Sequence, residues 1–322
     1  MRFLPRAVVL LIASLAVGLL PMQAAEAQSE WADDSSPHSE AELVSEVASI
    51  APGEPFTVAL RLEMEEGWHS YWKNPGDSGE PTSIDWSLPS GFEVGAIQWP
   101  YPHRIDTSML TSYGYSDEVL LLTTLTPPED LEPGTSLTLD ARAEWLICAD
   151  ICLPAHGDVQ LTLPVTASSP DPGAGAEAIA QSRAKLPKTV DAWTVQAARS
   201  SGSYTLALTS TDDRRLDLEG AQFYPLEEQV LDHAAPQPVS QEGSTSLIAL
   251  QQSSYASSPA DSLEGVLVAP EGQSWDADRT VRAMKVNVPV DTVLTGVAAT
   301  VSAAASAGGG SSLSLEIGRA HV

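Results

Sequence analysis

The sequence predicts an all-β protein with two antiparallel β-sandwich domains in tandem behind a secretory signal peptide. Three observations support this fold class. Apolar residues recur at every second position in several short stretches, which is the period of a strand with one buried face. Turn-forming Pro, Gly, Asn and Asp residues separate these stretches. Only one short segment has a helical pattern, so strands must supply most of the buried surface.

Residues 1–27 have the organisation of a signal peptide. Two arginines precede an apolar run over residues 7–20, and an Ala-Glu-Ala cleavage pattern ends at Ala27. A retained membrane anchor is the alternative, but the run is shorter than the ~20 residues that cross a bilayer. The exported chain is therefore expected to begin near Gln28 and to be periplasmic.

The chain is strongly acidic, with 43 acidic residues, 16 basic residues and a formal net charge of −27. Such a charge repels nucleic-acid phosphates and anionic lipids, and no run of basic residues along the sequence offsets it. We therefore expect no nucleic-acid partner and interpret the acidity as an aid to solubility. About 295 residues follow the signal peptide, which is enough for two domains of ordinary size.

The first sandwich domain is predicted over residues 43–167, after a loose acidic leader at 28–42. Alternating apolar positions predict strands at 56–64, 137–145 and 159–165, although Ala59 breaks the polar set of the first strand. The turn signals between the predicted strands are Asn74-Pro75-Gly76-Asp77, Pro127-Pro128 and Glu132-Pro133-Gly134.

The second half of the chain is predicted to contain a linker with a short helix at 168–186, because Ser, Pro and Gly fill its first positions. A second β domain without cysteine is expected over residues 187–291. Residues 292–315 have the Ala-, Gly- and Ser-rich composition of a flexible tether. The last seven residues, 316–322, match the translation of a common sequencing-adapter oligonucleotide, so the reading frame is expected to have been cut here. The alternative is a genuine short C-terminus.

The strongest chemical signal is the stretch WLICADICLP at residues 145–154, which contains both cysteines of the chain. Three residues separate Cys148 from Cys152, and a tight strand reversal could bring their Cα atoms within disulfide range. A stabilising staple is one interpretation, but so short a loop would contribute only about 2 kcal/mol in the chain-entropy model. A redox pair is the other, and spacing alone leaves the two open.

A metal site is a third interpretation of the same stretch. Cys148, Cys152 and His156 follow one another at four-residue steps, so a helix would place them on one face as copper or zinc ligands. Pro154 within that span argues against a helix, and no second cysteine pair completes a zinc site. We therefore expect no metal. The other histidines before the C-terminal tail are scattered and are interpreted as surface or packing residues: His38, His69, His103 and His233.

Asp150 lies between the two cysteines. A carboxylate close to either sulfur would raise that thiol's pKa and disfavour the attacking thiolate. One hypothesis is that the reduced pair stays unreactive until a docked partner changes this environment. A solvated turn aspartate is the alternative.

Several motifs together resemble the N-terminal region of DsbD-like thiol:disulfide interchange proteins, most closely the branch associated with copper tolerance. They are GWHSYWKNPGDSGEPTSIDW (67–86), IQWPYPHRI (97–105), SYGYSDEVLL (112–121), WLICADICLP (145–154) and, for the second β domain, FYPLEEQVLDHAAPQP (223–238). The resemblance covers roughly residues 40–290 and implies immunoglobulin-like sandwiches without a cofactor.

The resemblance also implies roles for particular residues. Cys148 and Cys152 would be the exchanging cysteines, which makes the chain a protein-disulfide reductase type of enzyme. The cap loop that shields them would be Tyr113, Gly114 and Tyr115, with Ser112 where some relatives have phenylalanine. Three further residues are candidates for the docking surface, although core packing is expected for at least one of them: Trp68, Tyr71 and Trp72.

The expected partners follow from the same resemblance. Electrons would come from a membrane-embedded reductase domain, which is expected in the same natural chain, and a thioredoxin-like domain is the second expected partner. The electrons would pass to periplasmic clients that carry disulfides. The full-length protein would be anchored in the inner membrane. Two competing hypotheses are a non-catalytic periplasmic copper-binding module that uses the cysteines as ligands, and a purely structural sandwich.

Overall fold

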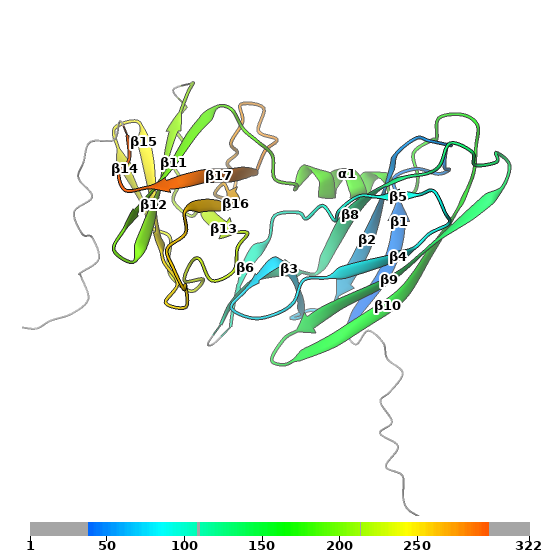
Figure 1. Ribbon diagram of the computed structural model, residues 1–322, viewed down its shortest axis with the longest axis horizontal. Helices are drawn as coiled ribbons and strands as arrows, with labels where there is room; N and C mark the ends of the chain where they lie inside the picture. The colour runs from blue at the N-terminus through cyan, green and yellow to red at the C-terminus, as the bar shows by residue number, and fades with distance from the viewer. Residues whose placement is uncertain (1–37, 108–109, 213, 296–322) are drawn as a thin grey trace, which may run out of the picture. The chain divides into compact units, whose positions relative to one another are not determined.

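The computed structural model describes residues 38–107, 110–212 and 214–295. Within these ranges the chain forms short strands and one α-helix, arranged in three sheets whose strands pair almost entirely antiparallel (Figure 1). The predicted all-β antiparallel class is confirmed. The predicted signal peptide, residues 28–37 of the predicted leader, and the tether and tail from residue 296 onward lie outside the described residues. Residues 39–42 of that predicted leader are not loose, because they belong to a β-strand.

The first sheet has the strand order β1-β2-β8-β5. Its strands are β1 (Ser39–Ser45), β2 (Phe56–Met64), β5 (Glu93–Val94) and β8 (Glu118–Thr126). The strand β2 buries residues of both faces, because the helix α1 (Ala176–Ala184) covers the outer face beside β8. Ile179 of α1 packs there against Ala59 and Leu122. The helix therefore accounts for the apolar break in the predicted alternation.

The segment before α1 is irregular, as predicted, but it packs closely against the chain after β1. Gly173 donates its backbone N–H to the carbonyl of Glu46 at 2.8 Å. A Cβ added at Gly173 would lie 2.6 Å from the backbone of Val47, so only glycine allows this approach. Arg183 of α1 then donates two hydrogen bonds of 2.8 Å to the Glu46 carboxylate. These contacts hold the helix over the first sheet.

The second sheet has the order β10-β9-β3-β7-β6, and β4 also pairs with β9. Its strands are β3 (His69–Gly76), β4 (Ser83–Ser87), β6 (His103–Asp106), β7 (Thr111–Ser116), β9 (Ser136–Cys148) and β10 (Cys152–Pro164). Inward-facing residues of this sheet and of the first sheet share one hydrophobic core, with Leu60, Leu121 and Leu139 almost fully buried. The indole of Trp145 donates to Ser39 Oγ at 3.1 Å across this core.

The third set of strands has the order β13-β16-β17-β11-β12-β15-β14. The strands are β11 (Trp193–Ser200), β12 (Ser203–Ser210), β13 (Gln222–Pro225), β14 (Val239–Glu242), β15 (Thr245–Gln251), β16 (Ser262–Val268) and β17 (Ala283–Asp291). A two-residue parallel contact between β11 and β17 joins two antiparallel halves. Their core is built around Trp193 and Trp275, whose rings meet edge to face at 5.5 Å.

Candidate redox site

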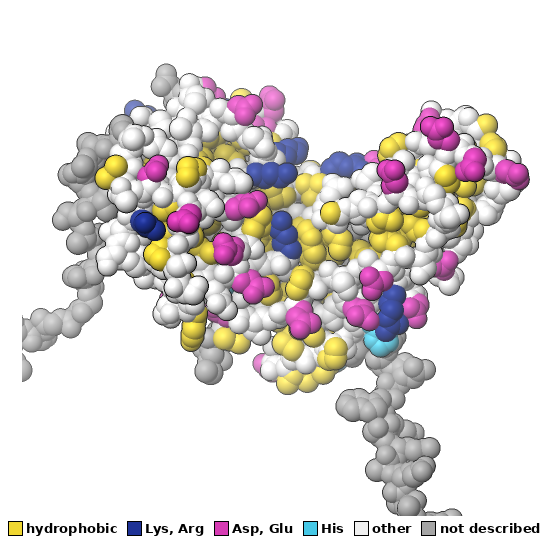
Figure 2. Space-filling view, in the orientation of Figure 1, with side chains coloured by type: hydrophobic (Ala, Val, Ile, Leu, Met, Phe, Trp, Pro, Cys, Tyr) yellow, Lys and Arg dark blue, Asp and Glu magenta, His cyan; other side chains and the backbone are white. Residues whose placement is uncertain are grey.

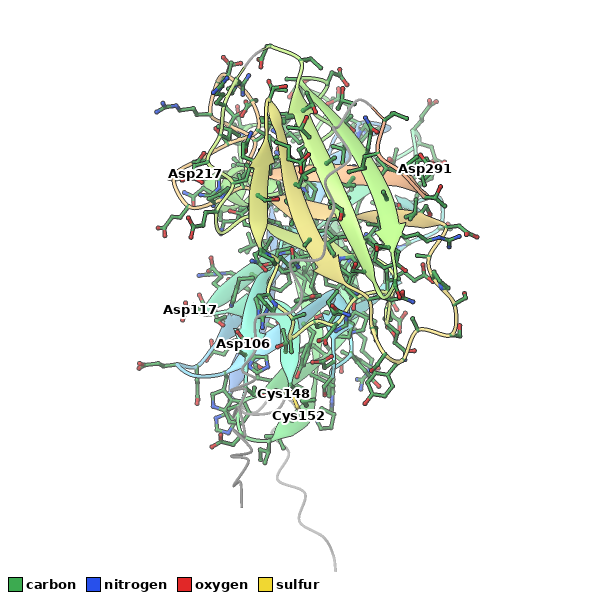
Figure 3. All side chains as sticks on the ribbon, turned by 90° about the vertical axis from the view of Figure 1, so that its left-hand side faces the viewer. Asp106, Asp117, Cys148, Cys152, Asp217 and Asp291 are labelled. Atoms are coloured by element: carbon green, nitrogen blue, oxygen red, sulfur yellow. A yellow bond between two sulfur atoms is a disulfide. The ribbon has the colours of Figure 1, made fainter. Side chains whose placement is uncertain are left out.

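The two cysteines close the end of the β9–β10 hairpin. Thirteen residue pairs hold the hairpin in register, and Cys148 lies directly opposite Cys152 at its tip. The two residues form a disulfide with their Cα atoms 4.1 Å apart (Figure 3). Pro154 lies inside β10, although proline has no N–H to donate to a strand ladder. This is tolerated because β10 is the edge strand of its sheet, where a missing N–H leaves no ladder bond unmade.

The two halves of the disulfide differ in exposure. Cys148 is completely buried, whereas Cys152 is exposed. The three-residue loop between them is closed by the Ala149 N–H, which donates to the Ile151 carbonyl at 3.0 Å. Ile151 is 61% exposed, so the tip presents an apolar side chain next to the accessible cysteine. An incoming thiolate therefore has an open approach to the Cys152 side of the bond.

Tyr71 contacts the disulfide from the neighbouring strand β3. Its hydroxyl lies 3.5 Å from Cys152 Sγ, and it must be the donor because a disulfide sulfur carries no hydrogen. The side chain is only 3% exposed. Burial raises the pKa of Tyr71, against a smaller lowering by its hydrogen bond with Ser112, so the hydroxyl remains protonated. The site thus places a neutral donor against the exposed sulfur.

His69 is the second side chain of β3 beside the disulfide. It is paired in register with Cys148, and its ring meets that of Tyr71 edge to face at 5.4 Å. Burial lowers the pKa of His69, and the charge of nearby His103 lowers it further. A neutral imidazole therefore lies next to the buried cysteine. The sequence alone leads to an interpretation of His69 as a scattered surface or packing residue, and its two-residue spacing from Tyr71 in β3 is the signal that could have placed it here.

Two glycines allow the close packing around Tyr71. Gly79 has a φ of 116°, and a Cβ added there would lie 2.3 Å from the Tyr71 ring. Gly114 lies opposite Tyr71 in β7, where an added Cβ would come within 2.0 Å of the Ser70 carbonyl oxygen. Both positions need the absence of a side chain for β3 to keep its neighbours.

The triplet predicted to form the cap loop lies in the strand β7 instead of a loop. Tyr113 is buried and packs edge to face on Tyr224, with ring centroids 4.9 Å apart. Tyr115 is also buried and donates its hydroxyl hydrogen to the Pro100 carbonyl at 2.7 Å. Alternation of the two tyrosines around Gly114 suits a strand between two paired neighbours, β3 and β6. A shielding role for this triplet stays a prediction.

The predicted docking residues occupy three different environments. Trp72 is 1% exposed and packs in the core against Tyr224. Trp68 is half-buried and stacks on His38 at a centroid distance of 3.9 Å. Tyr71 is buried but contacts sulfur. Only Trp68 and Tyr71 therefore remain near enough to the surface or the disulfide to take part in docking.

Asp150 and His156 both lie at the hairpin without joining the disulfide contacts described above. Asp150 is exposed in the tip loop. His156 is paired with Glu144 along the strands, so the helical face that would have aligned it with both cysteines does not exist. Across the described ranges, no group of three or more His, Cys, Asp or Glu side chains is arranged to hold a metal ion.

Comparison with known proteins identifies the part of the chain that carries this site. Residues 40–164 match the family model described as thiol:disulfide interchange protein DsbD, N-terminal. This segment belongs to the DsbD N-terminal family. It is an immunoglobulin-like module of the thiol:disulfide interchange type, and it holds the Cys148–Cys152 disulfide. No curated protein matches the chain.

Several solved structures match the chain, and the first of the following three is similar to it in fold. The N-terminal periplasmic domain of ScsB from Proteus mirabilis is 18% identical with a TM-score of 0.53, over 78% of this chain and 92% of that one. A protein of unknown function from Porphyromonas gingivalis W83 is 12% identical with a TM-score of 0.21, over 77% and 99%. Spo0M, a sporulation control protein from Bacillus subtilis, is 11% identical with a TM-score of 0.21, over 78% and 89%.

The ScsB domain shares the fold of this chain. The match reaches beyond residues 40–164 and includes most of the chain. Within the described residues, no helix combines the length and apolar character needed to cross a membrane.

Proposed function

We propose that this chain is a periplasmic electron relay, which accepts two electrons from a membrane-embedded reductase domain and passes them to oxidised periplasmic partners. The observation that carries this proposal is the disulfide at the hairpin tip, with Cys152 exposed and Cys148 completely buried. A disulfide that only stabilised the fold would gain nothing from having one of its cysteines exposed. A disulfide that another protein must attack requires an exposed cysteine.

The reductive half of the cycle begins with attack by a donor thiolate on Cys152 Sγ. The disulfide breaks, and Cys148 leaves as a thiolate that takes up a proton. A second donor thiolate then attacks the donor sulfur of the mixed disulfide and releases Cys152, so the donor becomes oxidised and the pair becomes a dithiol. Two electrons have moved to this chain.

The oxidative half uses the same atoms in reverse. The Cys152 thiolate attacks a client disulfide, one client sulfur leaves as a thiolate, and a mixed disulfide forms between Cys152 and the client. Cys148 then loses its proton and attacks Cys152 Sγ, which releases the second client thiol and restores the internal disulfide. Burial in an apolar setting disfavours the thiolate of Cys148, so Cys152 is the better first nucleophile.

The surroundings of the sulfurs support this division of roles. Tyr71 can donate its hydroxyl hydrogen to a Cys152 thiolate from the position it already occupies 3.5 Å from Cys152 Sγ. Next to Cys148, His69 is kept neutral by burial and by His103, so it offers no positive charge to a thiolate there. The exposed sulfur is thus the one with a donor in place.

The partners and location belong to the same proposal. The donor would be a membrane-embedded reductase domain in the natural chain, anchored in the inner membrane, and the partners would include a thioredoxin-like domain and client proteins with disulfides. Support comes from the DsbD family match and from the periplasmic origin of the ScsB domain that shares the fold. Ile151 would meet an apolar surface of these partners, because it is exposed beside Cys152.

Single-cysteine variants of the exported chain test the assignment of the attacked sulfur. Cys148→Ser should form a stable mixed disulfide with oxidised glutathione, because Cys152 is exposed and has lost its resolving partner. Cys152→Ser should react more slowly by at least about tenfold, because Cys148 is buried. Mass spectrometry after timed alkylation measures both rates.

The wild-type chain provides the control, since glutathione mixtures should convert it reversibly between a disulfide and two free thiols. Faster reaction of Cys148 than of Cys152 would reverse the proposed roles. A disulfide that resists reduction until the chain unfolds would contradict the relay and support a structural staple.

A further inference from the structure

The chain has only four lysines, and two of them line one groove. Lys73 and Lys285 line it directly. Lys188 lies between two lining residues, and its carbonyl accepts the N–H of Lys285 at 2.8 Å. Lys185 immediately precedes the lining residue Leu186. Figure 2 shows basic side chains beside hydrophobic ones in a hollow of this face.

These lysines are exposed and have no acidic partners among the described residues. Every ion pair found there uses an arginine or a histidine, and none uses a lysine. Glu264 is the single acidic residue that lines the groove. In a chain of net charge −27, an excess of positive charge at one groove is a local reversal of the molecule's field.

The lining groups of the groove influence one another electrostatically. Burial lowers the pKa of Lys73 most, the nearby charge of Lys285 lowers it further, and Glu264 opposes both. The two lysines repel each other, so an added carboxylate between them would relieve that repulsion as well as gain attraction. The groove is therefore set up to favour an anion.

The walls of the groove combine polar and apolar surface in about equal amounts. Trp99 and Leu226 are half-buried, and Val266 and Val286 lie deeper. The space amounts to about 620 Å³, within the ~300–1,000 Å³ range of ligand sites. A ligand that fits both features carries negative charge and an apolar or aromatic side chain.

The overall charge of the chain restricts the class of anion. A nucleic acid or an anionic membrane would bring many negative charges close to a surface of net charge −27, and both would be repelled outside the groove. A short segment with two or three carboxylates meets only the local positive field. Peptides of this kind also supply the side chain that the apolar part of the walls can bury.

We propose that this groove binds a short acidic peptide segment of a partner protein, with carboxylates beside Lys73 and Lys285 and an apolar side chain against Trp99 and Leu226. The residues that line the groove include neither cysteine nor Tyr71. The groove would hold a partner through residues other than the exchanging cysteines.

Calorimetric titration of the exported chain with two synthetic peptides tests the proposal. The probe is acetyl-Asp-Glu-Trp-Glu-Asp-amide, and its neutral twin is acetyl-Asn-Gln-Trp-Gln-Asn-amide. The acidic peptide should bind at least about tenfold more tightly than the neutral one at about 20 mM salt, and the difference should shrink at about 200 mM salt because salt screens exposed charges.

Variants connect the binding to the groove. The double variant Lys73→Gln/Lys285→Gln should lose at least about tenfold in affinity for the acidic peptide, whereas Lys73→Arg/Lys285→Arg should retain it. The matched control is Arg199→Gln/Arg215→Gln, which removes the same charge from two exposed arginines that do not line the groove. Its affinity should stay within about twofold of wild type.

Three results would overturn the proposal. Equal affinity for the acidic and neutral peptides would show that the groove does not recognise negative charge. An equal loss of affinity in the arginine control would show that binding depends on the net charge of the chain and not on the two groove lysines. Binding of inorganic phosphate or of anionic phospholipid vesicles with the same dependence on Lys73 and Lys285 would show that the groove recognises anions other than acidic peptides.

Discussion

Two regions of this molecule differ in how some of their buried aromatic residues are hydrogen-bonded. In the tryptophan region, residues 193–291, Trp193 donates to the Trp275 carbonyl at 2.8 Å and Trp275 donates to the Leu267 carbonyl at 2.9 Å. In the disulfide region, residues 39–164, the Trp72 indole N–H is buried with no acceptor among the described residues. Its neighbour Tyr71 donates to a sulfur instead of an oxygen.

The two regions direct the N–H and O–H donors of these buried aromatic side chains to different acceptors. The tryptophan region uses them to fix a core that contains no cysteine. The disulfide region directs a hydroxyl to a bond that is half exposed, at a small cost in satisfied hydrogen bonds. Core packing explains the aromatic residues of the tryptophan region, whereas the chemistry of the disulfide explains those around Cys152. Four predictions test this difference.

The largest expected effect is on stability in the tryptophan region. Trp275→Ala should lower the free energy of unfolding by about 3–5 kcal/mol, because it removes a completely buried indole and its hydrogen bonds. Urea denaturation followed by circular dichroism measures the change. A loss below about 1 kcal/mol would mean that this core is not the packed unit described here.

A smaller loss is expected from crowding β3 in the disulfide region. Gly114→Ala should cost about 1–3 kcal/mol, because the new Cβ would meet the Ser70 carbonyl oxygen at 2.0 Å. The matched control is Gly157→Ala in β10, where the nearest atom would be 3.6 Å away. Thermal unfolding should show a larger loss of stability for Gly114→Ala than for Gly157→Ala. Equal stabilities of the two variants would show that β7 does not approach β3 as closely as described.

The next effect concerns exchange rate more than stability. Tyr71→Phe removes the donor to Cys152 Sγ, so the Cys152 thiolate should be less favoured and the reduced chain should attack a disulfide more slowly. A hydrogen bond of about 0.5–1.5 kcal/mol corresponds to roughly a 2–10-fold change in rate. Reaction of the reduced chain with a chromogenic aromatic disulfide measures it.

The control for this variant is Tyr255→Phe, because Tyr255 is 82% exposed and lies in the tryptophan region. Its exchange rate should equal that of wild type. If Tyr71→Phe also leaves the rate unchanged, the hydroxyl contact has no part in the chemistry.

The smallest effect is a pH dependence of stability that His69 contributes. Burial and the charge of His103 lower the pKa of His69 in the folded chain, so the unfolded chain binds more protons in acid. The stability from keeping this ring neutral is complete above the unfolded pKa of about 6.5 and is lost as the pH falls through it. His69→Gln should therefore lose less stability than wild type between about pH 7 and about pH 5, measured by urea denaturation. An identical loss in both would show that His69 is not protonated on unfolding.

Much of the local structure could be predicted from the sequence. The alternation at 56–64 corresponds to β2 (Phe56–Met64), and the cysteine-bearing stretch forms the predicted reversal between β9 and β10. These predictions hold because a period of two and the turn residues are local properties of the chain. The expected cap loop at Tyr113–Tyr115 was read from a family motif, and the structure has a buried strand there.

By itself, the sequence predicted the all-β class and a strand reversal that could bring Cys148 and Cys152 within disulfide range, because both depend on spacing along the chain. The structure shows that the two cysteines do form a disulfide. Only the tertiary structure decided that Cys152 is the exposed half and that Tyr71 contacts it. It also decided that Lys73 and Lys285, far apart along the chain, line one groove, although no basic run exists in the sequence. Exposure and long-range proximity follow from how sheets pack, and spacing along one strand carries no information about its distant neighbours.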